Sequence, residues 1–221
     1  MEASTVRDGG VTPPRQEQAA TTRWPPEVKI GDPGPLGLAA FALTTFVLSM
    51  FNAELVNEAA VPVVFGLALA YGGIAQMLAG MWEFRSGNTF GAVAFTSYGA
   101  FWLSFWAFEQ FYASSITDKV ALGDGVGLYL IAWGIFTAYM FVASLRTTAA
   151  ISLVFLLLTV TFFLLGFGDT SANSDVHKLG GYFGLATAVA AWYASFAVVT
   201  NSTFGRTVLP VFPLKREEPA E

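Results

Sequence analysis

Residues 149–167 read AAISLVFLLLTVTFFLLGF and contain no charged side chain. A run of about 20 mostly apolar residues is long enough for a helix to cross the hydrocarbon core of a bilayer. The run is continuously apolar and does not alternate with polar residues, as a half-buried strand would. We therefore interpret residues 149–167 as a transmembrane helix.

Five further windows of the same kind lie on either side of this stretch, at residues 36–55, 60–82, 89–112, 125–145 and 179–199. Together they predict an all-α integral membrane protein with six transmembrane helices. The six-helix domain then spans residues 36–210, between flexible cytoplasmic tails at 1–35 and 211–221. The composition agrees, because only 12% of the 221 residues are charged, roughly half of what a soluble domain carries.

The two ends of the predicted spans differ in positive charge. The segments on the amino-terminal side carry nine Lys or Arg residues: four in the tail, Arg85, Arg146, and three in the carboxyl-terminal segment. The opposite side carries only Lys119 and Lys178. Because cytoplasmic loops are enriched in Lys and Arg, we expect both termini in the cytoplasm and a multi-pass protein of the cell membrane.

Composition also excludes several kinds of site. The net charge of −5 and the lack of a basic patch argue against a nucleic-acid partner, and with no cysteine there is neither a disulfide nor a thiolate metal site. The single histidine, His177, falls in a predicted outer loop near Asp169 and Asp175 and is interpreted as a solvated loop residue. No nucleophile elbow, P-loop or dinucleotide fingerprint is present. We expect no catalytic site, metal or cofactor.

Polar side chains inside the predicted spans are the candidates for function, because such groups are costly in hydrocarbon. They gather in the first three spans. For a single Ser or Thr, a hydrogen bond back to its own helix is the usual explanation. Tyr98 differs because it adds a bulky hydroxyl at mid-membrane depth. The candidates in the interior of these spans are Thr44, Thr45, Gln76, Thr96, Ser97 and Tyr98.

All eleven Lys and Arg residues fall outside the six spans or at their edges. No fixed positive charge is therefore available at mid-membrane to hold an anion. A carboxylate crossing here would be stabilised by hydroxyls, amides and helix amino termini, or would cross as its neutral protonated acid. This favours a weak-acid substrate or proton-linked movement over a strongly charged substrate such as phosphate.

Several segments of the chain resemble a known family. They read DPGPLGLAAF at 32–41, YGGIAQ at 71–76, GNTFG at 87–91, AFTSYG at 94–99 and FGRTVLP at 204–210. In this order they resemble the motifs of the acetate uptake transporter family, the acetate/succinate permeases of bacteria and their fungal relatives. The match covers about residues 31–210. One departure is Asp32, where the family has Asn at the opening of the first helix; as a helix cap Asp serves as well.

The resemblance implies six helices per subunit, a homo-hexamer in the bilayer, and movement of acetate and related short carboxylates through a pathway within each subunit. It also implies a hydrophobic constriction formed by Phe41, Tyr98 and Leu158. A narrow apolar collar of this kind excludes water and hydrated ions by dewetting, and its side-chain volume sets the largest acid that passes. Further candidates for binding the substrate or lining the pathway are Asp32, Thr44, Thr45, Gln76, Asn88, Thr96, Ser97 and Ala191, the last at a position linked to substrate size.

The sequence leaves several alternatives open. Movement of the carboxylate is either coupled to protons or passive, and the preferred substrate is any of acetate, formate, propionate, lactate or succinate. A different class of function is a membrane sensor or assembly protein that uses the same scaffold without significant flux. An intramembrane enzyme is disfavoured, because no catalytic constellation can be assembled.

Overall fold

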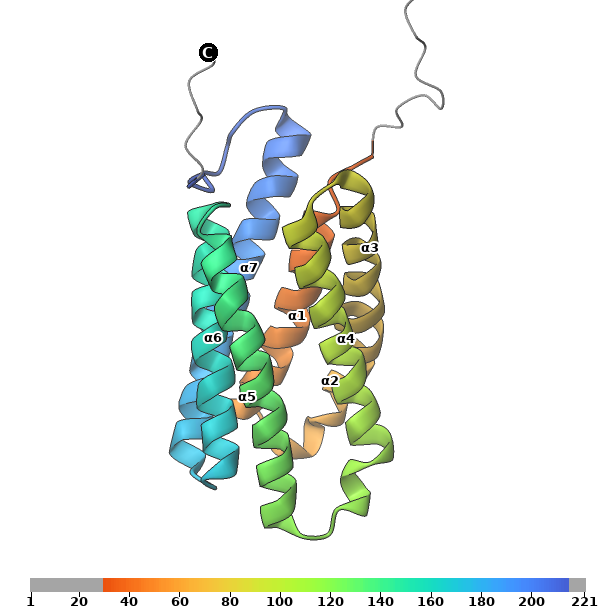
Figure 1. Ribbon diagram of the computed structural model, residues 1–221, viewed down its shortest axis with the longest axis vertical. Helices are drawn as coiled ribbons and strands as arrows, with labels where there is room; N and C mark the ends of the chain where they lie inside the picture. The colour runs from red at the N-terminus through yellow and green to blue at the C-terminus, as the bar shows by residue number, and fades with distance from the viewer. Residues whose placement is uncertain (1–29, 215–221) are drawn as a thin grey trace, which may run out of the picture. The chain divides into compact units, whose positions relative to one another are not determined.

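The computed structural model describes residues 30–214, and this part of the chain is helical with no strand. Three consecutive elements, α2, η2 and α3, join end to end, so that the chain passes up and down the bundle six times (Figure 1). The predicted all-α fold is confirmed. The elements are α1 (Gly34–Asn52), η1 (Glu58–Ala60), α2 (Pro62–Leu69), η2 (Ala70–Ala75), α3 (Gln76–Ser86), α4 (Thr89–Phe111), η3 (Ala113–Ser115), α5 (Lys119–Ser144), α6 (Ala149–Thr170) and α7 (Ser174–Phe204).

Five of the six passes within residues 30–214 are long and apolar enough to cross a membrane. The sixth, α4, has 23 residues and sufficient length, but its Ser, Thr, Tyr and Trp residues lower its mean hydropathy. Two of the largest of these side chains, Tyr98 and Trp102, are buried in the bundle, and Trp106 is half-buried. Because protein rather than lipid covers these polar groups, we interpret α4 as the sixth span.

Two helices are longer than the sequence predicts. α5 begins at Lys119 instead of 125, because the Asp118 carboxylate accepts hydrogen bonds from the backbone N–H groups of the first turn. α7 runs from Ser174 to Phe204 instead of 179–199, because the Asn173 side chain caps its start and Gly205, at φ 63°, ends it in the left-handed region. Hydropathy locates the apolar part of a helix, whereas capping residues set its ends.

The helices are arranged as a ring. α6 packs along α5 and α7, α1 packs along α7, and α3 packs along both α1 and α4. The last neighbours in the ring, α4 and α5, hardly touch through their backbones. Aromatic side chains bridge them instead: Phe101 stacks on Tyr129 with ring centroids 5.6 Å apart. These aromatic side chains therefore hold α4 and α5 farther apart than closely packed helices, and they leave space inside the ring.

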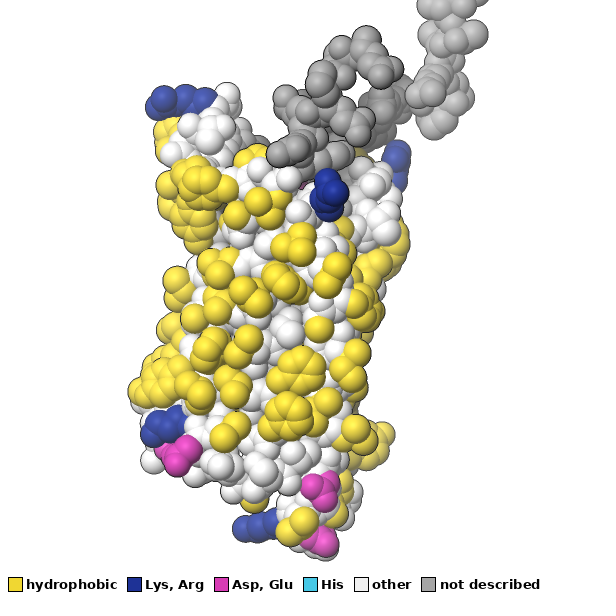
Figure 2. Space-filling model, turned by 60° about the vertical axis from the view of Figure 1, so that its left-hand side comes forward, with side chains coloured by type: hydrophobic (Ala, Val, Ile, Leu, Met, Phe, Trp, Pro, Cys, Tyr) yellow, Lys and Arg dark blue, Asp and Glu magenta, His cyan; other side chains and the backbone are white. Residues whose placement is uncertain are grey.

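Charged residues lie at the two ends of the bundle and apolar residues around its middle. Figure 2 shows this on one face, where hydrophobic side chains cover the central band. Leu128 and Phe196, for example, are 67% and 61% exposed. The first residue of α1 and the last of α7 lie at the same end of the bundle (Figure 1). A surface of this kind is suited to lipid or to another apolar protein face.

The chain after α7 folds back on the bundle. The Asn201 side chain accepts hydrogen bonds from the backbone N–H groups of Val208 and Leu209. The N–H of Ala149 then donates to the carbonyl of Phe212 at 2.8 Å. Residues 211–214, which the sequence assigns to a tail, are therefore hydrogen-bonded to the turn between α5 and α6. The remaining parts of the predicted tails, 1–29 and 215–221, lie outside the described residues.

Glycines make the closest helix contacts. A comparison of substitutions at Gly80 and Gly66 tests this packing. A Cβ on Gly80 would lie 2.5 Å from the backbone nitrogen of Thr96, whereas a Cβ on Gly66 would meet nothing within 4 Å. We expect Gly80→Ala to lower stability by about 1–3 kcal/mol, because the α3–α4 contact must open. Gly66→Ala, in the same membrane pass, should leave stability unchanged or raise it slightly. Thermal unfolding of the purified protein in detergent measures both, and equal midpoints for the two variants would contradict this packing.

Candidate functional site

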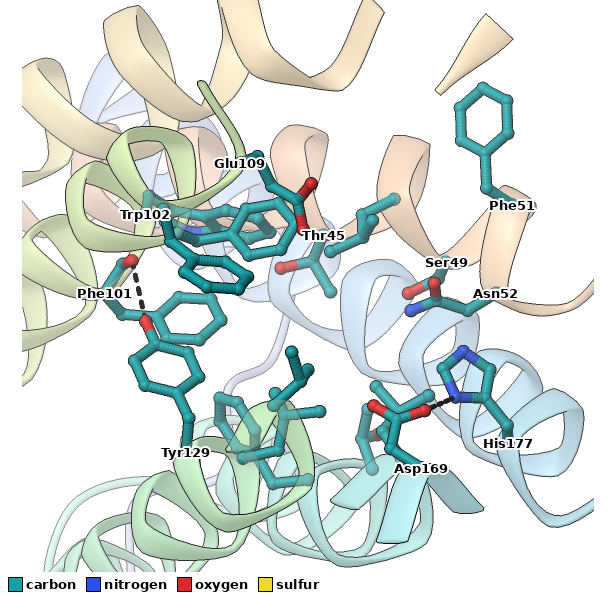
Figure 3. A pocket seen from close by; sticks show the side chains of 18 of the residues that line it. Thr45, Ser49, Phe51, Asn52, Phe101, Trp102, Glu109, Tyr129, Asp169 and His177 are labelled. Carbon is teal, nitrogen blue, oxygen red and sulfur yellow. Dashed lines mark hydrogen bonds and ion pairs between the residues drawn. The ribbon is translucent and has the colours of Figure 1, made fainter. Parts of the chain in front are cut away.

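A cavity of about 470 Å³, here called the vestibule, lies inside the ring between α1, α4, α5 and α6 (Figure 3). Its walls are mostly apolar and aromatic, with Phe101, Trp102 and Tyr129 on the α4–α5 side. A second hollow of about 530 Å³, the mouth, shares Asn52, Asp169, His177 and two apolar residues with it. Because α1 ends and α7 begins here, the mouth lies at the end of the bundle away from the chain termini.

Phe41, Tyr98 and Leu158 lie near the end of the vestibule opposite the mouth. Leu158 of α6 lines the vestibule. The first lining residue of α1 comes about one turn after Phe41, and the first lining residue of α4 about one turn after Tyr98. The three side chains are only 5%, 3% and 4% exposed, and they belong to one buried apolar cluster. The ring centroids of Phe41 and Tyr98 are 5.7 Å apart. The three residues expected at a constriction thus lie together where the cavity ends.

The hydroxyl of Tyr98 is occupied by a contact to α5. Thr137 donates its hydroxyl proton to the carbonyl of Trp133 at 2.7 Å, so Tyr98 donates to Thr137 Oγ1 at 2.9 Å. The Tyr98 ring also packs edge-on against Phe136. The phenol is therefore fixed in position, and its apolar ring is the part that faces Phe41. The sequence suggested a polar role for this hydroxyl at mid-membrane, and the structure shows it joining two helices.

Several buried polar atoms have no hydrogen-bond partner among residues 30–214. Thr45 Oγ1 and Trp102 Nε1 belong to residues that line the vestibule, and Trp102 was not among the sequence candidates. Gln76, which is fully buried, has both side-chain polar atoms unpaired, and Thr96 Oγ1 is unpaired as well. A buried polar group without a partner costs about 1–3 kcal/mol, so these are positions where water or a polar solute would bind.

Three other sequence candidates do not reach the vestibule. Thr44 donates to the carbonyl of Ala40 at 2.9 Å and packs against Gly72, which is a helix-packing role. Ser97 is half-buried on α4 and is not part of the lining. Ala191 is fully buried on α7, within the same apolar cluster as Phe41, Tyr98 and Leu158.

The end of the bundle near the chain termini carries its own polar group. Asp32 accepts a hydrogen bond from the N–H of Gly34 at 2.8 Å, and Asn88 accepts one from the N–H of Gly91 at 3.1 Å. Asn88 therefore caps α4, whereas Asp32 stands one position before the N-cap of α1, Pro33, and binds the first residue of that helix. Between them lies Glu83, which is 2% exposed and accepts from the Ser86 hydroxyl at 3.2 Å. The positive ends of two helix dipoles favour a carboxylate there.

His177 is not a loop residue, which corrects the sequence interpretation. It lies in the first turn of α7, and its Nδ1 is 2.6 Å from Oδ1 of Asp169 in the last turn of α6. Both side chains line the vestibule and the mouth. The predicted spans ended at 167 and began again at 179, so sequence analysis placed this pair outside the helices. The polar caps of α7 were the available signal for a longer helix.

The chain is similar to proteins with known names. Acetate permease A of Emericella nidulans is 42% identical over 197 residues, which cover 83% of this chain and 66% of the permease. The succinate-acetate/proton symporter SatP of Escherichia coli K12 is 39% identical over 183 residues, or 83% of this chain and 96% of SatP. A structure of the bacterial acetate channel SatP matches with a TM-score of 0.77 at 39% identity, covering 83% of this chain and 99% of that chain.

The sequence profile of one family covers nearly the whole chain. It matches residues 16–216, which include every helix of the bundle as well as the segment that folds back after α7. The motifs that carry the resemblance in the sequence all fall within these residues. The chain therefore belongs to the GPR1/FUN34/yaaH family.

Proposed function

We propose that this protein moves acetate and related short carboxylates, succinate among them, across the cell membrane through a pathway inside the helix ring. The carrying observation is the vestibule, which Leu158 lines and which lies next to the buried cluster that contains Phe41 and Tyr98. Relatives that match most of this chain are named for acetate and succinate permeation. Transport, rather than chemical conversion, is the activity that this arrangement supports.

The vestibule suits a small weak acid. Its volume of about 470 Å³ lies in the range of small-molecule sites, about 300–1,000 Å³. Its apolar walls accept a methyl or methylene group, while Thr45 Oγ1 and Trp102 Nε1 offer unpaired donors to a carboxylate. Beyond the constriction, Gln76 and Thr96 offer further unpaired polar atoms. We infer that the pathway continues past them toward Asn88 and Asp32 at the far end.

The constriction would act as a filter for size and charge. Three buried apolar side chains hold no water and give a hydrated ion no hydrogen bonds. A small acid passes when its apolar group fits between them. Ala191, buried in the same cluster, has a small side chain, so its volume would help to set how large an acid is accepted.

Uptake of labelled acetate into liposomes that contain the purified protein tests the function. Protein-free liposomes are the control, because acetic acid crosses bilayers unaided. Uptake above this control that rises with an inward proton gradient establishes coupled transport, and excess uptake insensitive to the gradient indicates a channel. No excess flux under either condition would reject transport and favour a membrane sensor or assembly protein on this scaffold.

Substitution of the constriction should change selectivity. We expect Leu158→Ala to raise lactate uptake severalfold relative to acetate, because the collar loses most of a side chain. Leu156→Ala is the matched control: Leu156 is on the same helix but 43% exposed on its outer face, so selectivity should not change. Competition between labelled acetate and lactate in liposomes measures both. An unchanged ratio in Leu158→Ala would remove Leu158 from the constriction.

We also infer that both chain termini face the cytoplasm, with the mouth of the vestibule outside. Arg85 lies in the last turn of α3, and Arg146 and Arg206 follow α5 and α7. All three lie on the side of the termini, which supports this orientation. The chain has no cysteine, so single cysteines at Ser202 and Ser115 report on the two ends. An impermeant thiol reagent added to intact cells should label Ser115→Cys and spare Ser202→Cys; the reverse pattern would invert the topology.

A homo-hexamer is the assembly we propose in the bilayer, in line with the family resemblance. The broad exposed apolar surface around the middle of the bundle is compatible with contacts between copies. Native mass spectrometry of the protein released from detergent micelles should give a mass six times that of the 23.6 kDa chain. A dominant monomer peak under conditions that preserve known membrane oligomers would contradict this assembly.

A further inference from the structure

The adjoining ends of α6 and α7 hold one ionisable pair at the edge of the vestibule. A Cβ on Gly168 would lie 2.7 Å from the backbone nitrogen of His177, so only glycine lets the two helices approach this closely. The N–H of His177 donates to the carbonyl of Asn173 at 3.1 Å, which fixes the first turn of α7. The close approach brings Asp169 and His177, on neighbouring helices, within hydrogen-bond distance.

The pairing leaves one nitrogen of the imidazole free. A carboxylate can only accept hydrogen bonds, so Nδ1 of His177 carries the proton that bonds to Asp169 Oδ1 at 2.6 Å. Nε2 is then a bare acceptor when the ring is neutral and a donor when the ring is protonated. It forms no hydrogen bond with any side chain of residues 30–214. Figure 3 shows this nitrogen on the side of the ring away from Asp169, toward Asn52 and Ser49.

The surroundings of His177 are acidic. Asp169 on α6, Glu109 on α4, Glu54 after α1 and Glu58 in η1 line the vestibule or the mouth. Of these, Glu54 accepts from Lys178 at 3.0 Å. The charged residues on α7 itself, Asp175 and Lys178, do not line either cavity. On α5, Asp124 lies within the stretch that lines the cavities but is not itself a lining residue.

His177 is therefore the only lining side chain among the described residues that can carry a positive charge. A carboxylate anion that enters the mouth meets several negative charges and one group able to attract it. Attraction requires that the imidazole be protonated, since the neutral ring presents a lone pair toward the cavity. The carboxylate can therefore bind at Nε2 of His177 only when this nitrogen carries a proton.

We propose that His177, held by Asp169, is the residue at which a carboxylate substrate and its proton come together before the constriction. A proton from outside water binds Nε2, and the resulting N–H binds one oxygen of the carboxylate. The proton then moves from Nε2 to that oxygen, which gives the neutral carboxylic acid and restores the neutral imidazole. One proton and one carboxylate enter, and one acid molecule leaves, so charge and atoms balance. This assignment rests on the proposed transport function.

Proton transfer at the Asp169–His177 pair is useful because the pair lies before the constriction. The collar of Phe41, Tyr98 and Leu158 contains no charge, and an ionised carboxylate is costly in an apolar environment. The neutral acid avoids most of that cost. Proton transfer in the vestibule, which shares Asn52 with the mouth, prepares the substrate for the apolar segment.

A direct test uses the fact that His177 is the only histidine of the chain. The full-length protein, purified with a histidine-free tag and labelled with ring-¹⁵N histidine, gives one imidazole signal in lipid nanodiscs. At a fixed pH of about 6.5, within the range where histidines titrate, acetate should move this signal toward the protonated form. Sodium chloride at equal ionic strength is the control. An equal response to acetate and chloride would overturn the proposal without any mutation.

Transport variants give the second test. Labelled acetate is the substrate, because one proton makes it neutral, and uptake by protein-free liposomes is subtracted. His177→Gln should reduce uptake at an external pH near 6 by about tenfold, the loss expected for one charge-assisted hydrogen bond. It should also abolish the rise in uptake between about pH 8 and pH 6. Asp169→Asn should also reduce uptake, because the imidazole loses the carboxylate that orients it.

Lys119→Gln is the matched control, because it removes a positive charge at the same end of the bundle from a residue outside both cavities. Its uptake and pH profile should equal those of the unmodified protein. If the unmodified protein gives no flux above protein-free liposomes, the transport function itself fails. If it does, and His177→Gln keeps the same rate and pH profile, only the assignment of His177 fails. Should His177→Gln not fold, the nanodisc experiment decides.

Discussion

The bridge between α4 and α5 is the interaction on which the interior of this protein depends. Most neighbouring helices in the ring pack closely, many through glycines, but these two are joined by Phe101 on Tyr129 and by the hydrogen bond from Tyr98 to Thr137. Aromatic side chains are wide, so they hold the helices apart while still excluding lipid. Small residues between α4 and α5 would let these two helices approach each other and fill the vestibule. The same contacts turn the Tyr98 ring toward Phe41.

Much of the fold can be predicted from the sequence, because hydrophobic length is a strong signal in membrane proteins. The six apolar windows correspond to the six passes, and Pro33-Gly34-Pro35 correctly marks the start of α1. The errors concern helix ends. Asp118 and Asn173 extend α5 and α7 into polar sequence that a hydropathy window rejects. Capping is a local hydrogen-bond effect, and average hydropathy does not register it.

The candidate site was harder to predict, because it arises from contacts between helices that are distant in the chain. Motif resemblance brought together Phe41, Tyr98 and Leu158, which do lie in one buried cluster. The resemblance did not distinguish between two consecutive residues, Thr44 and Thr45. Thr45 lines the vestibule, whereas Thr44 packs on Gly72. Neighbouring residues on a helix face different directions, so only the arrangement of the ring decides which of them meets the cavity. Trp102 was missed because the sequence does not show that its indole N–H is buried without a hydrogen-bond partner.

The absence of Lys and Arg from the interiors of the spans links the site to its energetics. A fixed cation in the vestibule would hold a carboxylate tightly and would stay charged at every physiological pH, so release toward the collar would be costly. A histidine offers a positive charge that disappears when its proton moves to the bound anion. Asp169 keeps the imidazole oriented, and the acidic residues around the mouth oppose an anion that arrives without its proton. In the mechanism we propose, selectivity for protonated weak acids would follow from two features in series, an ionisable pair at the mouth and an uncharged collar behind it, and neither would give it alone.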